Sequence, residues 1–169
     1  FETTARTWFN NAKIVSDDFN TLNLGVLNGE IDAYFSGGTY TVSSARMEGL
    51  NHLYHVAPSK GPADGKGAIL WIELNSAVNN PDFHSGAFDW LEFILQPDVS
   101  YYVGTAGGTL LPVGQLGDPK VLAKFSNDEL NAFQWDEFDY RVENAVEYDV
   151  VPDYDRLYDI YTAALRDRS

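Results

Sequence analysis

Apolar residues recur at helical spacing along the first 50 residues. In residues 2–13, Ala5, Trp8 and Phe9 fall on one face of a predicted helix. Ser16, Asp17 and Asp18 then form a typical helix cap, and they precede a second predicted helix over residues 18–27, ended by Asn28 and Gly29. The pattern predicts a third helix over residues 39–48, stopping at Gly49. This part of the chain is therefore expected to be rich in short helices.

Compact apolar runs between these helices predict strands at residues 31–35 and 52–58, with a central strand within residues 67–78. Residues 104–117 contain too much glycine for a stable element and are expected to form a loop. The second half is otherwise predicted to be almost all helical, over residues 82–96, 97–103, 121–125, 128–133 and 154–166.

The order of these elements indicates an α/β protein, in which helices pack in layers against a sheet. In open α/β sheets, ligands bind beyond the carboxyl ends of strands, where loops meet the N-termini of helices. Two stretches lie at such ends, residues 35–39 and residues 71–73. Both are candidates for a binding site.

Trp71 and Glu73 lie two residues apart in the predicted central strand. Residues i and i+2 of a strand point to the same face, so the indole ring and the carboxylate share one side. An organic ammonium ion is attracted by both surfaces, through the ring quadrupole and through charge. The alternative is a core tryptophan in an ordinary strand, with Glu73 at its solvent-exposed end.

The turn at residues 36–39 supports two kinds of ligand. Free backbone N–H groups at a helix start, around Gly37 and Gly38, favour an anion such as a carboxylate or sulfate. The same turn, from Ser36 to Thr39, with Tyr34, Phe35 and Tyr40 around it, could instead supply hydroxyl groups and rings to a cation. A plain helix cap, with glycines for the tight bend, is a third interpretation.

The chain has 169 residues, with 25 acidic against 11 basic side chains and a formal net charge of −14. This balance disfavours nucleic acids and anionic membranes as partners, and it suits either a cationic ligand or a solvating surface. The chain contains no cysteine, which excludes disulfides and thiolate chemistry. It opens on Phe1 within a helical pattern, and we therefore expect a mature or truncated piece of a longer protein.

The sequence lacks the common catalytic motifs: it has no G-x-S-x-G elbow, no phosphate-binding Gly-Lys-Ser/Thr loop and no H-E-x-x-H pair. His52 and His55 fall on opposite faces of a predicted strand, and His84 begins a predicted helix. Asp136, Glu137 and Asp139 form a charge run of the kind that is usually solvated. We therefore predict no catalytic residues, no metal site and no cofactor.

Four segments resemble the second half of periplasmic solute-binding proteins, and in particular the spermidine/putrescine-binding family of polyamine ABC importers. They are NGEIDAYFSGGTYTVSSA (residues 28–45), GKGAILWIELNSAVNNP (65–81), FDWLEFILQPDVSYYVG (88–104) and YDRLYDIYTAAL (154–165). Their order and spacing carry the resemblance, which covers most of the chain.

The resemblance implies a type II periplasmic-binding-protein-like lobe, with a mixed sheet flanked by helices and a helix-rich C-terminal half. Residues 1–169 would then be one lobe of a two-lobed protein, and residues 79–104 would pack with the other lobe. That arrangement would leave apolar surface on this chain and favour its self-association. It further implies a periplasmic protein that delivers its ligand to a membrane permease.

Within this family, Trp71 and Glu73 match the ligand-stacking tryptophan and the amine-binding acid. Phe35 matches a second ring at a strand end, and Ser36 follows it. The chain departs from the family after Gly104, where an expected aromatic residue is missing. The candidates for a late ligand-binding side chain are Trp135, Asp136 and Asp139.

The predicted function is therefore capture of a polyamine such as putrescine or spermidine by Trp71, Glu73, Phe35 and the turn that includes Ser36, Gly37 and Thr39. Three alternatives remain open at this point. The same scaffold could bind an amino acid or another small anion at Gly37 and Gly38, or the chain could be an α/β enzyme or a structural interaction module.

Overall fold

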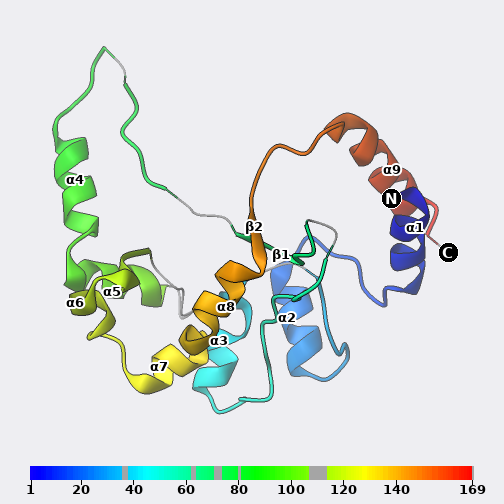
Figure 1. Ribbon diagram of the computed structural model, residues 1–169, viewed down its shortest axis with the longest axis horizontal. Coiled ribbons are helices and arrows are strands. Elements are labelled where there is room, and N and C mark those ends of the chain that lie inside the picture. The colour runs from blue at the N-terminus through cyan, green and yellow to red at the C-terminus, as the bar shows by residue number, and fades with distance from the viewer. Residues whose placement is uncertain (36–37, 62–63, 71–73, 80, 107–113, 169) are drawn as a thin grey trace. The chain divides into compact units, whose positions relative to one another are not determined.

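The computed structural model describes residues 1–35, 38–61, 64–70, 74–79, 81–106 and 114–168. The chain divides into two compact units: residues 1–35 with 149–169 form the first, and residues 36–148 form the second. Figure 1 shows the elements of both units, coloured along the chain. The first unit thus combines the two ends of the chain, and each unit is described by itself below.

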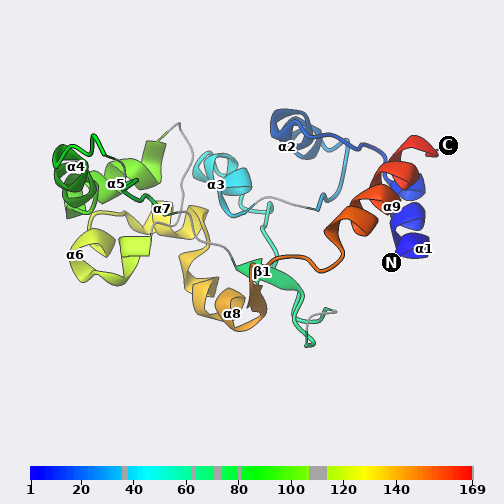
Figure 2. The same ribbon diagram turned by 90° about the horizontal axis from the view of Figure 1, so that it is seen from above.

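The first unit contains helices α1 (Glu2–Asn11), α2 (Phe19–Leu27) and α9 (Tyr154–Arg166). Helices α1 and α9 lie side by side, as Figures 1 and 2 both show. The ring of Phe9 meets Tyr161 edge-on, with 5.3 Å between centroids. Arg6 Nη1 forms an ion pair with Asp167 at 3.1 Å. Aromatic and charged contacts therefore join the N-terminal helix to the C-terminal one.

Helix α2 begins and ends as the sequence predicts. The carboxylate of Asp18 accepts hydrogen bonds from the backbone N–H of Asn20 at 3.1 Å and of Thr21 at 3.2 Å. The Thr21 hydroxyl donates a third at 2.6 Å, and together these bonds lower the pKa of Asp18. At the other end, Asn28 is the C-cap and Gly29 adopts a positive φ of 69°. These residues confirm the predicted cap and stop.

The second unit contains one small sheet and several short helices. Its elements in chain order are α3 (Tyr40–Met47), β1 (Ala68–Leu70), α4 (Gly86–Ile94), α5 (Pro97–Thr105), η2 (Gly114–Gly117), α6 (Pro119–Leu122), α7 (Asn127–Ala132), η3 (Trp135–Glu137), α8 (Phe138–Glu143) and β2 (Ala145–Glu147).

The predicted helices are confirmed, with changed limits: α4 begins at Gly86, four residues after the expected start, and α6 ends earlier than expected. Helix α8 and strand β2 were not predicted. The apolar and polar residues of 138–147 are too closely mixed to indicate either element. The second half is thus helix-rich, as expected, but it also supplies a strand.

The core of the second unit lies where α5, α6 and α7 meet. Phe125 and Phe133 pack edge to face, with 5.7 Å between ring centroids, and Tyr101 of α5 meets Phe125 at 5.0 Å. Leu116, Val121 and Ala132 complete the buried cluster. Each aromatic pair in such geometry stabilises the fold by about 0.5–1.5 kcal/mol, in addition to the stabilisation that comes from burying the surface of the rings. In the described part of the chain, no helix has the length and apolar character needed to cross a bilayer.

The fold is α/β, and its described sheet consists of the parallel pair β1 and β2. Ala68 pairs with Ala145, Ile69 with Val146 and Leu70 with Glu147. The expected mixed sheet is thus not found among the described residues. The strand predicted at residues 31–35 is wrong: these residues do not join a ladder, and the Tyr34 hydroxyl instead donates to Asn23 Oδ1 at 2.7 Å.

The strand predicted at residues 52–58 is also wrong, because side chains satisfy its backbone groups in place of a neighbouring strand. Gln134 accepts from the His55 N–H at 2.9 Å and donates to the His55 carbonyl at 3.1 Å. Arg141 donates to the same carbonyl at 3.0 Å. Arg46 donates to the carbonyls of Asn51 at 3.0 Å and Leu53 at 2.9 Å. The segment is therefore extended without being part of a sheet.

Candidate functional site

Four of the six predicted ligand-binding residues, Trp71, Glu73, Ser36 and Gly37, lie outside the described residues. The two others are described, and they belong to different units: Phe35 ends the N-terminal part of the first, and Thr39 lies in the second. The described part of the candidate site thus consists of Phe35, Thr39 and strand β1, which ends directly before Trp71.

Phe35 presents a largely free ring. It is 82% exposed, and one face stacks on Trp8 of α1 at a centroid distance of 5.2 Å and an interplanar angle of 9°. Trp8 is itself exposed. A ring supported on one face and open on the other can stack on an apolar or cationic group. The position of Phe35 is thus compatible with the stacking role that the sequence suggests.

Thr39 is the N-cap of α3 and is 9% exposed. Its carbonyl accepts from the N–H groups of Val42 at 3.3 Å and Ser43 at 3.2 Å, so it participates in the first turn of the helix. The preceding carbonyl, of Gly38, accepts from the Thr41 hydroxyl at 2.7 Å. Most of the described polar groups around Thr39 are therefore used within the helix start.

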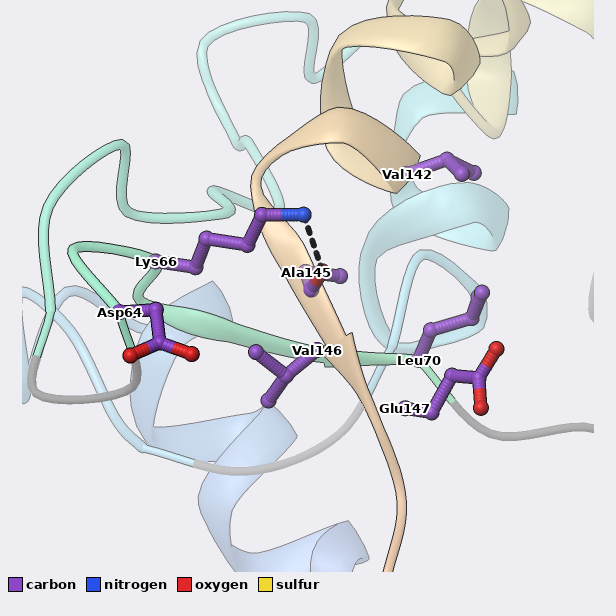
Figure 3. Close-up of a pocket in the computed structure, with 7 residues that line it drawn as sticks. All are labelled: Asp64, Lys66, Leu70, Val142, Ala145, Val146 and Glu147. Carbon is purple, nitrogen blue, oxygen red and sulfur yellow. Dashed lines mark hydrogen bonds between the residues drawn. The ribbon is translucent and has the colours of Figure 1, made fainter.

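An open pocket of about 450 Å³ lies along the strand pair (Figure 3). At one end Lys66 Nζ donates to the Ala145 carbonyl at 3.1 Å. At the other end, Glu147 lies beside Leu70, where β1 and β2 finish (Figure 3). The complete lining is Asp64, Lys66, Leu70, Val142, Ala145, Val146 and Glu147.

Two glycines fix the approach to β1. A Cβ at Gly67 would lie 2.6 Å from the Pro58 carbonyl oxygen, and a Cβ at Gly61 would lie 2.2 Å from the Lys66 carbonyl oxygen. Both distances are far below van der Waals contact. The Gly61 N–H also donates to the Gly65 carbonyl at 3.0 Å, which holds these two residues together. Positions 61 and 67 therefore require glycine.

The exposed face of β1 leads toward Trp71. Ile69 is 62% exposed, so the side of β1 on which it lies is open to solvent. Directly after β2 (Ala145–Glu147), the Tyr148 N–H donates to the Leu70 carbonyl at 2.9 Å, and Tyr148 is 73% exposed. Sequence reasoning missed Glu147 and Tyr148, although a short run of apolar and acidic residues before Pro152 marks this segment.

The late candidates named from the sequence lie elsewhere. Trp135 packs against the core cluster and stacks on Phe138 at 4.8 Å. Asp136 and Asp139 lie on η3 and α8, away from the lining of the β1–β2 pocket. Among the described residues, no group of three or more histidine and carboxylate side chains is placed to hold a metal ion.

In comparisons with protein-family models, curated proteins and solved structures, the chain matched none of them. The function proposed below is therefore inferred from the sequence of the chain and from the geometry of its described elements.

Proposed function

We propose that the chain is a ligand-binding lobe of a solute-binding protein that captures an organic cation of the polyamine class. The observation that carries the proposal is the exposed face of β1, on which Ile69 is open to solvent. Trp71 and Glu73 come two and four residues later in the sequence, so the proposal places them on the same face of a longer strand. An indole ring and a carboxylate on one open face form a suitable surface for a primary ammonium group.

The register of the sheet suggests a further member of this pocket. Leu70 pairs with Glu147, the last residue of β2, and Tyr148 follows it. In the proposed pocket, the pairing would continue by one residue, and Tyr148 would lie opposite Trp71. Two aromatic side chains on neighbouring strands can enclose a methylene chain, while Glu73 balances the charge of its amine. The strongly acidic chain would attract such a cation and repel anions.

In the two-lobed protein that this proposal implies, the lobes would close on the ligand by hinge bending, and the closed form would dock on a membrane permease. The location would be the periplasm, where the ligand arrives. The protein would bind its ligand without transforming it, so we do not propose an enzyme.

Thermal unfolding of the full two-lobed protein with putrescine and spermidine tests the proposal. At 100 times its dissociation constant, a ligand stabilises the folded protein by about 2.7 kcal/mol. Glu73→Gln should abolish the amine-dependent shift, and Tyr148→Ala should weaken it. A shift produced by amino acids or sulfate and unaffected by Glu73→Gln would instead support anion binding near Gly37 and Gly38.

Helix α4 supports the expectation that residues 79–104 pack against a further surface. Its nine residues, GAFDWLEFI, include seven apolar ones and no buried one. The side chains of Phe88, Trp90 and Phe93 are all exposed. A helix that is apolar nearly all round is normally buried.

We therefore expect the isolated chain to self-associate through α4, which size-exclusion chromatography with light scattering can measure. Trp90→Glu should shift the chain toward monomer, and Tyr140→Glu on α8 is a matched control. A wild-type chain that is monomeric at high concentration would refute this part of the proposal.

A further inference from the structure

Helix α9 has a buried side and an exposed side of different chemistry. Leu157, Ile160 and Ala164 are at helical spacing and are the less exposed residues, and Ala164 is buried. The helix packs against α1, which accounts for this apolar side. Tyr154, Tyr158 and Tyr161, at positions i, i+4 and i+7, follow the neighbouring side of the helix, which is exposed, although Tyr161 also meets Phe9 of α1 edge-on.

The three tyrosine rings form a continuous stack along the helix. Tyr154 and Tyr158 lie 5.9 Å apart at an interplanar angle of 19°, and Tyr158 and Tyr161 lie 6.3 Å apart at 26°. Their exposed fractions are 60%, 53% and 41%. Side-chain pairs at positions i and i+4 stabilise a helix slightly. That small contribution does not explain why three large rings remain in contact with water.

Two carboxylates run parallel to the stack. Asp155 and Asp159 each follow a tyrosine by one residue and are themselves four residues apart. Like charges at this spacing destabilise a helix, so a neutralising cation nearby would be favourable. No ion pair to either carboxylate is found in the part of the first unit that the structure describes. We call Tyr154, Tyr158, Tyr161, Asp155 and Asp159 the tyrosine face.

Most cations of the first unit are already engaged elsewhere. Arg6 and Arg166 bind Asp167 at 3.1 Å each, and Arg6 also binds Glu2. Arg168 donates to backbone carbonyls of Ala12 and Lys13, and Lys13 donates to the Glu30 carbonyl. Arg156, which follows Asp155 on α9, forms no ion pair among the described residues and can neutralise at most one of the two carboxylates. At least one negative charge of the tyrosine face is therefore left for a cation from outside this unit.

We infer that the tyrosine face is a docking surface for an arginine-rich segment of a partner protein. A guanidinium group stacks on aromatic rings and forms two parallel hydrogen bonds to a carboxylate, which matches alternating tyrosine and aspartate side chains. This inference does not depend on the amine pocket proposed above, because none of its residues belongs to that pocket.

The size of the surface sets the expected strength. A buried aromatic side chain contributes roughly 150–250 Å², so three half-exposed rings offer about 300 Å². This is well below the roughly 800 Å² that each partner contributes to a standard stable interface, so the contact should be weak and transient.

Fluorescence anisotropy of a labelled eight-residue oligo-arginine peptide, titrated with the full chain, tests the inference. We expect measurable binding at low salt, and weaker binding of oligo-lysine, whose ammonium group stacks less well. Tyr158→Ala should weaken oligo-arginine binding about two- to five-fold, and Tyr158→Phe should retain it. Asp155→Asn combined with Asp159→Asn should weaken binding and reduce its dependence on salt.

Tyr140→Ala is the matched control, because Tyr140 is a similarly exposed tyrosine on α8 of the second unit, and its removal should leave binding unchanged. Circular dichroism checks that each variant keeps its helices. Equal affinity for the two peptides, or equal loss in Tyr158→Ala and Tyr140→Ala, would show that net charge alone attracts the peptide and would overturn the inference. Absence of binding at low salt would also overturn it.

Discussion

Protonation of His55 should destabilise the second unit as the pH falls. The imidazole is partly buried, and its Nδ1 is buried without a hydrogen-bond partner among the described residues. Burial and, to a smaller extent, the charge of Arg141 lower the pKa of His55 to about 4, against an opposing effect of Glu137. The folded protein thus holds His55 neutral at pH values where an unfolded chain would protonate it.

The direction of the effect follows from proton binding. Between pH 6.5 and about 4, the unfolded chain binds a proton at His55 and the folded chain does not, so stability falls as the pH decreases through this window. Below about pH 4 both forms are protonated, and the loss from this group ends. The full difference corresponds to ~3 kcal/mol. Because the imidazole is only partly buried, we expect ~1–2 kcal/mol after solvent screening.

Urea unfolding at several pH values between 7 and 4, followed through amide resonances of α7, measures this loss in the second unit. His55→Phe removes the titration without leaving an unpaired nitrogen, so the variant should lose less stability over the same window. His52→Asn, an exposed histidine three residues earlier, is the control and should follow the wild type. Parallel curves for wild type and His55→Phe, or a His55 resonance that titrates near pH 6.5, would refute the reasoning.

Two further predictions concern stability. Asp18→Ala removes the N-cap of α2 and should cost about 1 kcal/mol, seen as a lower helix content and earlier unfolding by circular dichroism. Asp17→Ala should have little effect, and an equal loss would contradict the capping role. Gly67→Ala forces a Cβ against the Pro58 backbone and should destabilise the second unit by at least about 1–3 kcal/mol in urea unfolding. Gly117→Ala, where a Cβ meets nothing within 4 Å, should be tolerated, and equal effects would show that the close contact is unimportant.

The helices were predictable because their signals are local. Capping at Asp18, the stop at Gly29 and the apolar stripe of α9 can each be read within a few residues of sequence. The last helix, Tyr154–Arg166, has the limits that the sequence predicts. Helix α8 was missed because its six residues are too short to display a period.

The strands were less predictable because a strand requires a partner that sequence reasoning must find elsewhere in the chain. Residues 52–58 have a strand-like composition, but Gln134 and Arg141 occupy the backbone groups of His55 that a neighbouring strand would need. These side chains lie about 80 residues away, and Gln134 adopts a left-handed conformation, with φ of 57°, that no local pattern indicates.

The candidate site shows the same division between local and distant information. The aromatic and acidic character of Trp71 and Glu73 is visible in the sequence. Which residue of a neighbouring strand comes near β1 depends on the register of the sheet, and that register joins residues far apart in the chain. Tyr148 comes directly after β2, where its N–H donates to the Leu70 carbonyl, whereas Trp135, a candidate chosen by composition, packs against the core cluster. Residue type alone therefore does not identify a binding residue.

Two backbone constraints determine where the strand toward Trp71 runs. Gly67 lies against Pro58, which fixes the start of β1, and the hydrogen bond from Tyr148 N–H to the Leu70 carbonyl fixes its end. A ligand surface built on this strand thus depends on a glycine that contacts no ligand. If the amine pocket is correct, Gly67→Ala should weaken amine binding as well as folding, whereas Glu73→Gln should weaken binding alone.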